Sequence, residues 1–154
     1  MKLKKLLLIF FLLPISCMAK KESDFEKMLA GFPQCIFENV YVDYGTQEPQ
    51  HKYFKDRKMK PYKVENGAAY FNVDEHFHGL HVTQTFISAG YDVVAIIFDE
   101  PISSVEIKLK SFLRHGYNGN WPAGGEVLLP SPSLKADKTS PNHTILFCDF
   151  EANY

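Results

Sequence analysis

The fold of this chain is decided by residues 69–99, which read AYFNVDEHFHGLHVTQTFISAGYDVVAIIFD. Residues 69–78 alternate apolar and polar side chains with the period of two that a half-buried strand requires. One face of that strand would carry Phe71, Val73 and Phe77, and the other Tyr70, Asn72, Asp74, His76 and His78. Residues 80–88 and 91–99 are two further β-rich runs, and the connections between the three runs are short. The stretch therefore predicts an antiparallel meander of three strands.

A short helix and a strand are predicted before the meander. Residues 23–26, SDFE, form a capping box, and Gly31 with Pro33 ends the helix that it starts. Residues 34–43 are rich in β-branched and aromatic side chains, which favour a strand. Residues 44–68 contain glycine and proline breakers and many charges, so we predict an irregular segment there.

A second helix is predicted after the meander. Ser103 and Glu106 form another capping box, and an apolar stripe at helical spacing follows until His115-Gly116. The alternation over residues 105–110 would also fit a strand, but the cap and the terminal glycine both favour the helix.

The last predicted element is a hairpin. Residues 126–130 and 144–150 would pair across a long loop, residues 131–143. Together these elements predict an α+β fold, with an antiparallel sheet of about five to six strands and two helices on one face. The chain shows no internal repeat or linker, so residues 20–154 are predicted to form a single α+β domain.

The first 19 residues have the composition of a secretory signal peptide. A cationic start precedes an apolar run, residues 6–13, that is too short for a permanent membrane span. Cleavage after Ala19 would leave a mature chain that begins at Lys20. The alternative is a lipoprotein anchored at Cys17, because residues 13–17, LPISC, partly match the pattern of acylation sites. Both alternatives predict a protein outside the cytoplasm, and the style of the leader indicates a bacterial periplasm.

Charge and cysteine content narrow the possible functions. The chain has 17 basic and 18 acidic residues, and the leader holds three of the lysines, so the mature protein is mildly acidic and not a general nucleic-acid binder. Beyond the leader, Cys35 and Cys148 remain. An oxidising compartment favours one disulfide between them, which would tie the first strand to the last. Two buried, unpaired thiols are the alternative.

Asp74, His76, His78 and His81 form the densest group of potential metal ligands. Alternate residues of a strand share a face, so these side chains could converge on a zinc, copper or nickel ion. Same-face neighbours on one strand lie roughly 6.5 to 7 Å apart, which is wide for three ligands of a single ion. The alternative is a polar strand surface that happens to be rich in imidazole.

Two segments have the composition of partner-binding loops. Residues 51–63, HKYFKDRKMKPYK, interleave cations with aromatic rings, and Tyr53, Lys55 and Arg57 are the candidate contacts to an anionic partner. Residues 116–125, GYNGNWPAGG, offer Tyr117, Asn118 and Trp121 as contacts to a protein partner. The alternatives are a solvated loop for the first segment and a Trp121 that folds back over the core for the second.

No catalytic motif is recognisable. The chain has no Gly-x-Ser-x-Gly, its cysteines are predicted to be oxidised, and the neighbouring carboxylates Asp74/Glu75 and Asp99/Glu100 would face opposite sides of a strand. We therefore predict a protein that is not an enzyme and needs no cofactor.

Residues 30–35 (AGFPQC), 60–64 (KPYKV) and 69–73 (AYFNV) loosely resemble segments of small secreted proteobacterial proteins. In its leader, single α+β domain, disulfide and aromatic loops, the chain also resembles periplasmic immunity and hydrolase-inhibitor proteins. That resemblance implies a bacterial periplasmic protein that neutralises a protein partner, either a toxin or a cell-wall hydrolase. A periplasmic metal-binding protein is the alternative. Contact with a membrane is expected only if Cys17 carries a lipid.

Overall fold

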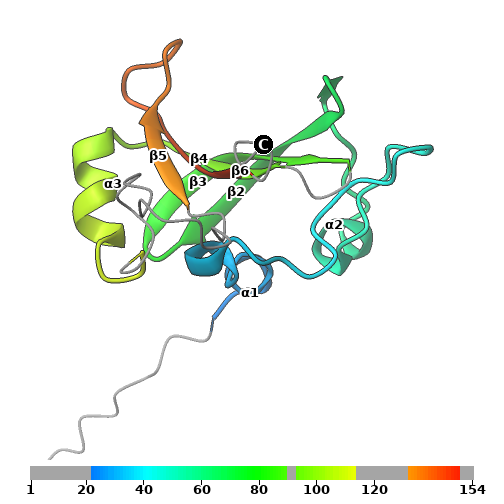
Figure 1. Ribbon diagram of the computed structural model, residues 1–154, viewed down its shortest axis with the longest axis horizontal. Helices are drawn as coiled ribbons and strands as arrows, with labels where there is room; N and C mark the ends of the chain where they lie inside the picture. Colours follow the sequence, from blue (N-terminus) through cyan, green and yellow to red (C-terminus); the bar gives the residue numbers. More distant parts are fainter. Residues whose placement is uncertain (1–21, 90–92, 114–131, 150–154) are drawn as a thin grey trace, which may run out of the picture.

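A computed structural model of the protein describes residues 22–89, 93–113 and 132–149. In chain order, the elements of this part are α1 (Asp24–Met28), the 3-10 helix η1 (Phe32–Gln34), α2 (Lys52–Asp56), β1 (Lys63–Glu65), β2 (Ala68–Phe77), β3 (Leu80–Ser88), β4 (Val93–Phe98), α3 (Ile102–Leu109), β5 (Ser133–Ala136) and β6 (Thr144–Asp149) (Figure 1). The predicted leader, the predicted helix end at His115-Gly116 and the predicted strand at residues 126–130 lie outside the described residues.

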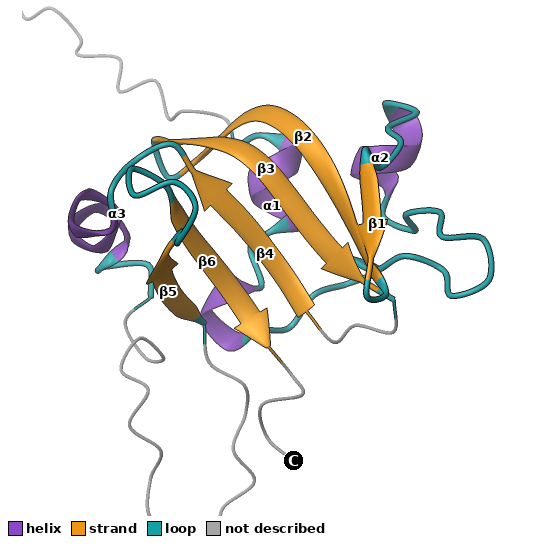
Figure 2. Ribbon diagram, turned by 90° about the horizontal axis from the view of Figure 1, so that it is seen from above, coloured by secondary structure: helices purple, strands orange, loops and turns teal. Residues whose placement is uncertain are grey.

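The six strands of the described residues form one antiparallel sheet in the order β1-β2-β3-β4-β6-β5 (Figure 2). The strands β2, β3 and β4 are the predicted meander, and β3 has the predicted bounds. The last strand, β6, pairs with β4 on one side and with β5 on the other, so it lies inside the sheet. The predicted α+β class with an antiparallel sheet is confirmed.

The strand register separates a core face from an outer face. Phe71, Thr85, Ile96 and Leu146 are consecutive partners across β2, β3, β4 and β6, and all four are fully buried. The neighbouring row holds Tyr70, Phe86, Ala95 and Phe147, which point to the opposite side because successive side chains of a strand alternate. The alternation predicted for residues 69–78 is realised as far as Phe77, where β2 ends, whereas His78 lies in the turn that follows.

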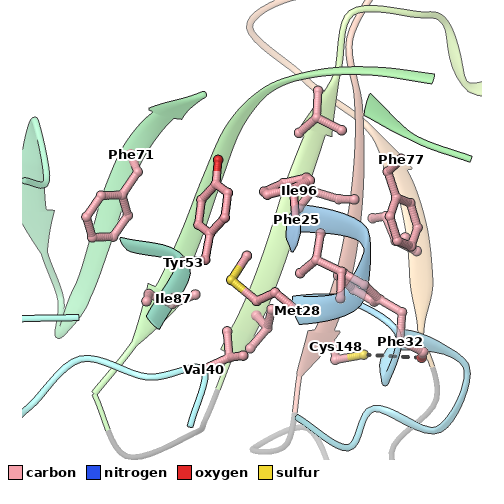
Figure 3. Packing of buried hydrophobic residues seen from close by; sticks show 14 of the residues in the cluster. Phe25, Met28, Phe32, Val40, Tyr53, Phe71, Phe77, Ile87, Ile96 and Cys148 are labelled. Atoms are coloured by element: carbon pink, nitrogen blue, oxygen red, sulfur yellow. Dashed lines mark hydrogen bonds between the residues drawn. The ribbon is translucent and has the colours of Figure 1, made fainter. Parts of the chain in front are cut away.

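Helix α1 packs against the core face of the sheet. Figure 2 shows α1 behind the strands, with α2 beside the β1 edge and α3 beside the β5 edge. Figure 3 shows the side chains of α1 and η1 lying among residues of the sheet. The ring of Phe25 lies 5.2 Å from that of Tyr53, and the ring of Phe32 lies 5.9 Å from that of Phe77. The capping box predicted at Ser23 and Glu26 is present in both directions.

A disulfide joins Cys35 to Cys148, as predicted, with a Cα–Cα distance of 5.6 Å. Both residues are fully buried. The bond ties the segment after η1 to β6, and not one strand to another, because residues 34–43 do not form the predicted strand. Cys35 and Asn39 have φ angles of 50° and 58°, which an extended strand does not allow. Within residues 34–43, only Val42 forms isolated β-bridges, one to Pro49 and one to Ala89.

Residues 44–68 were predicted to be irregular, yet α2 and β1 lie within them. Helix α2 depends on a distant part of the chain, because the ring of Phe54 lies 4.6 Å from that of Phe71. Strand β1 instead pairs with β2 across the two-residue turn Asn66-Gly67, in which both residues have positive φ angles. The predicted loop at residues 131–143 likewise contains β5, which pairs with β6. A partner that is distant in sequence is invisible to a local pattern, which is why α2 was not predicted. Strand β1 did have a local signal, because Asn-Gly between two β-rich runs is typical of a hairpin turn.

The helix predicted after β4 is present as α3, but its predicted cap is wrong. The N-cap residue is Pro101, and no side chain caps this end. Ser103 lies inside the first turn, where a cap residue has no role. Glu100 instead accepts hydrogen bonds from Ser104 and from the Lys108 ammonium. These bonds from Lys108 and Ser104 hold the pKa of Glu100 below its usual value.

Candidate functional site

A loop with an exposed aromatic tip projects from one end of the molecule. We call it the Tyr44 loop (residues 42–49), and Figure 1 shows it extending past α2. Tyr44 is 80% exposed, the largest exposed fraction among the large hydrophobic residues of the described part of the chain. Tyrosine is one of the residues that most often dominate interface energies, so a tyrosine at the tip of a projecting loop is a candidate contact residue.

The Tyr44 loop is held by its own hydrogen bonds. The Asp43 carboxylate accepts from the Gly45 N–H at 3.0 Å, from the Thr46 N–H at 2.8 Å and from the Thr46 hydroxyl at 3.0 Å. These bonds, those from Thr46 first, lower the pKa of Asp43. The Gln47 N–H donates to the Asp43 carbonyl at 2.8 Å, which closes the turn. The backbone on both sides of Tyr44 is therefore fixed before any partner arrives.

The base of the loop is anchored to the sheet. The Val42 N–H donates to the Ser88 carbonyl at 3.2 Å, at the end of β3. The Asp43 N–H donates to the Glu48 carbonyl, and the Gln50 N–H donates to the Tyr41 carbonyl, both at 2.9 Å. The loop is thus a short hairpin-like arm attached to the body of the protein at Val42.

A basic patch begins directly after the loop. It consists of the exposed cations Lys52, Lys55, Arg57, Lys58 and Lys60, on α2 and the residues that follow it. The Arg57 guanidinium lies 4.2 Å from the centre of the Tyr53 ring and 3.9 Å from the Asp24 carboxylate, and Lys55 donates to the Gln50 side chain at 2.9 Å. Lys52, Lys58 and Lys60 form no ion pair with another described residue. The patch is positive although the chain as a whole is not.

Tyr53 was predicted to contact a partner, and the structure corrects that prediction. Its side chain is 2% exposed, and its hydroxyl donates to the Glu75 carboxylate of β2 at 2.8 Å. Burial, with the bonded Glu75 next in importance, raises the pKa of Tyr53, so the hydroxyl keeps its proton. The alternation of cations and rings in residues 51–63 arises because the rings of Tyr53 and Phe54 enter the core while the cations stay in water.

A cleft of about 540 Å³ lies between α1 and the base of the Tyr44 loop. Its walls include Lys27 and Met28 of α1, Ile36 and Glu38 before the loop, and His51 and Lys52 after it. Ile36 is 64% exposed at this cleft. The loop, the patch and the cleft thus form one continuous region that is contributed mostly by residues 36–60.

The four residues of the predicted metal cluster do not converge. Asp74 accepts from His81 at 2.9 Å, and the His76 and His81 rings lie 5.5 Å apart. His78 instead sits at a turn with a φ of 49° and lies 4.1 Å from the Phe112 ring, where burial lowers its pKa. In residues 22–89, 93–113 and 132–149, no three His, Cys, Asp or Glu side chains are placed to hold a metal ion.

The structure joins two residues to this cluster that sequence analysis did not select. Asp99 lies 4.0 Å from His81 and 3.3 Å from His143. His143 directly precedes β6, far away in sequence from Asp99, and the pairing of Phe98 of β4 with Thr144 of β6 brings the two residues together. The result is a chain of carboxylates and imidazoles that runs from Asp74 of β2 through His81 of β3 to the residues that follow β4 and precede β6.

The Tyr44 loop was not among the predicted contacts, although the sequence contains a signal for its turn. Residues 43–46 read DYGT. An aspartate with a glycine and a hydroxyl residue two and three positions later is typical of a turn that the carboxylate organises. Two of the predicted contacts, Lys55 and Arg57, are exposed beside this loop. The other three, Tyr117, Asn118 and Trp121, lie outside the described residues.

Comparisons with protein-family models, with curated proteins and with solved structures found no match to this chain. Within the described ranges, no helix has both the length and the apolar character that crossing a membrane would require.

Proposed function

We propose that this protein is a non-enzymatic binding protein of the bacterial periplasm that neutralises a toxin or a cell-wall hydrolase. Export would follow from the leader at residues 1–19, and the buried Cys35–Cys148 disulfide is consistent with an oxidising compartment. The observation that carries the proposal is the Tyr44 loop, a projecting arm whose aromatic tip is 80% exposed while hydrogen bonds to Asp43 and across the base of the loop hold its backbone.

The loop supports this function because it is ordered in advance. Binding a flexible loop costs free energy for ordering the backbone and side chains, and a loop held by its own hydrogen bonds avoids most of that cost. Tyrosine is one of the residues that most often dominate interface energies. A fixed arm with a tyrosine at its tip suits insertion into the cleft of a partner enzyme.

The basic patch supports a partner with an acidic rim. Lys52, Lys58 and Lys60 have no ion-pair partner among the described residues, so an acidic surface would gain their attraction without first breaking bonds. Charge complementarity of this kind raises the association rate and selects among partners. Tyr117, Asn118 and Trp121 are retained as further proposed contacts.

A non-enzymatic role is supported by what the described residues offer for chemistry. Cys35 and Cys148 are joined and buried, so neither supplies a thiolate. The Asp74–His81–Asp99–His143 chain has bases, but no hydroxyl or thiol side chain of a described residue forms a hydrogen bond with either imidazole. We infer binding and not turnover.

Site-specific crosslinking tests the proposal. A photo-crosslinking amino acid is placed at Tyr44 in the protein expressed in the producing bacterium, and a matched control carries it at Ile107, which is 78% exposed on α3. We expect one adduct from position 44 that position 107 does not form. The adduct protein is then purified, and the wild-type chain must suppress its toxic or hydrolytic activity.

Substitution of the tip gives the quantitative test. Tyr44→Ala should weaken binding to that partner by about thirtyfold, the usual effect of losing a dominant interface side chain, and should change the free energy of unfolding by less than about 0.5 kcal/mol. Ile107→Ala should change neither quantity. Equal binding by the wild type and Tyr44→Ala, or a partner whose activity is unaffected, would refute the proposed function.

A further inference from the structure

The N-terminus of α2 is capped by a histidine. The Tyr53 N–H donates to Nδ1 of His51 at 3.1 Å, and His51 has the extended backbone of an N-cap residue. A backbone N–H can only donate, so Nδ1 must be an unprotonated acceptor. The bond therefore requires the neutral imidazole with its proton on Nε2.

Protonation of His51 is incompatible with this cap. The imidazolium carries a proton on both ring nitrogens, so Nδ1–H would face the Tyr53 N–H, two donors against each other. The ring would have to turn away, and the Tyr53 N–H would lose its partner. Glycine excepted, the residues that usually cap helices are hydroxyl, carboxylate or amide residues, none of which loses its acceptor near neutral pH.

Charged groups of both signs surround the imidazole. Lys52 and Asp56 belong to α2, Glu38 precedes the Tyr44 loop, and Lys27 of α1 lines the same cleft as His51. Burial lowers the pKa of His51 most strongly, and the positive charge of Lys52 acts in the same direction, whereas Glu38 and Asp56 oppose it. The surroundings thus favour the neutral form that the cap needs.

Helix α2 depends on this cap more than a long helix would. It has only five residues, fewer than a helix needs to be stable by itself. The N–H groups of Phe54 and Lys55 donate to the His51 carbonyl at 3.1 and 3.3 Å, so His51 organises the whole first turn. The same turn carries Lys52 and Lys55 of the basic patch.

We propose that His51 is a pH-sensitive latch, which holds α2 and its basic patch in place when neutral and releases the start of α2 when protonated. The latch is a property of the free protein. Its consequence, that the partner is released in acid, rests on the function proposed above.

The direction in which pH changes the stability contributed by His51 follows from the linkage between proton binding and folding. A histidine whose pKa is lower in the folded protein than in the unfolded chain binds protons more readily after unfolding. Its contribution to stability is complete above the ordinary histidine value of 6.5 and is lost progressively as the pH falls below it. Acid, and not base, therefore opens the latch.

Nuclear magnetic resonance of the free full chain tests the latch directly. At about pH 7.5, long-range ¹H–¹⁵N spectra should show His51 with a proton on Nε2 and none on Nδ1. Amide exchange protection of Tyr53 and Phe54, divided by that of Ile96 in β4 to remove global unfolding, should fall roughly fivefold between about pH 7.5 and 5, which is the factor expected for a lost cap.

His51→Asn is the matched variant, because asparagine caps helices and does not titrate in this range. Its protection ratio should change less than about twofold between the same two pH values. A proton on Nδ1 at neutral pH, or an equal change in the wild type and His51→Asn, would overturn the latch whatever becomes of the partner.

The affinity for the partner that is crosslinked at position 44 is then measured at both pH values. Wild-type affinity should fall by roughly fivefold over this pH interval, and His51→Asn should keep its affinity. If the protection ratios behave as expected but the affinities of both proteins fall equally, the latch does not regulate binding.

Discussion

At the scale of single residues, Gly31 shows how one missing atom shapes the segment that leads to the disulfide. A Cβ added at Gly31 would lie 1.6 Å from the Ile36 carbonyl oxygen, although the φ angle of −77° would suit any residue. The Ile36 N–H also donates to the Gly31 carbonyl at 3.1 Å, so the two backbones are in direct contact. Glycine is required at position 31 because no room is left for a Cβ atom, and not because of the backbone conformation.

Gly31→Ala should lower the free energy of unfolding by about 3 kcal/mol or more, because backbone must move in a closely packed region. Urea unfolding measures the loss. Gly45→Ala is the control, since a Cβ there would meet the nearest atom, Asp43 Oδ1, at an ordinary 3.5 Å. A loss of the same size in both variants would contradict the steric explanation.

A second prediction at this scale concerns Tyr53, whose hydroxyl reaches Glu75 from the core. Tyr53→Phe keeps the ring but leaves the Glu75 carboxylate without this donor, so stability should fall by roughly 1–2 kcal/mol. Tyr62→Phe, which removes a hydroxyl bonded to Gln84 from a side chain that is 50% exposed, should cost less than about 0.5 kcal/mol. Thermal unfolding of both variants compares them, and equal losses would show that burial of Tyr53 does not strengthen its bond.

At the scale of elements, the structure offers two similar turns with different proposed roles. Asp43 organises the Tyr44 loop, and Asp137 accepts from the Thr139 N–H at 2.8 Å and from its hydroxyl at 2.7 Å in the β5–β6 turn. Only the first turn carries an exposed aromatic tip. Comparing substitutions of Asp43 and Asp137 therefore distinguishes an effect of preorganising the Tyr44 loop from a general effect of destabilising a turn.

Asp43→Ala should weaken binding to the partner by roughly fivefold even though Tyr44 is intact, because the arm must then be ordered on binding. Amide exchange at Gly45 and Thr46 should accelerate at the same time. Asp137→Ala should leave the affinity unchanged. If Asp43→Ala binds as tightly as the wild type, preorganisation does not contribute.

The two titrating groups of this region act in different pH ranges. The pKa of Asp43 is lowered, so its contribution to loop stability is complete above its ordinary value of 3.8 and is lost only as the pH falls below it. The cap at His51 is lost below 6.5. At about pH 5, α2 should therefore loosen while the Tyr44 loop stays closed.

At the scale of the whole molecule, the disulfide closes almost the entire described chain into one loop. Its cysteines are 113 positions apart, and both are fully buried. Replacing both by serine should lower the free energy of unfolding by roughly 4 kcal/mol, mostly because the unfolded chain gains freedom. Thermal unfolding of Cys35→Ser/Cys148→Ser measures the loss, and Cys35→Ala/Cys148→Ala controls for the buried hydroxyls. Unchanged stability in the alanine variant would contradict a role for the cross-link.

The elements predicted correctly are those whose pattern is local. The alternation of residues 69–78, the bounds of β3 and the capping box at Ser23 all follow from neighbours in sequence. The failures have different causes. Helix α2 was not predicted because its partners Phe71 and Glu75 are distant in sequence, so local preference does not reveal it. Residues 34–43 have the composition of a strand but contain left-handed residues that no apolar pattern reveals.

Some residues of the candidate site could also be predicted from the sequence, and others could not. Exposed Lys55 and Arg57 could be selected by charge alone, and DYGT could have marked the turn at Tyr44. That Tyr53 is buried follows only from the packing of α2 on the sheet. Asp99 and His143 meet because β4 pairs with β6, which no spacing in the sequence indicates.

The α+β class, the central meander and the pairing of Cys35 with Cys148 could be predicted without the structure. Alternating side chains and helix caps are patterns of neighbouring residues, and only two cysteines lie beyond the predicted leader. Which face of each segment meets water became known only from the folded structure. That choice places Tyr44 outside and Tyr53 inside, and it puts a histidine at the start of α2 as its cap. The physical reason is that burial and hydrogen-bond partners are properties of pairs of segments, and a pair exists only after the chain has folded.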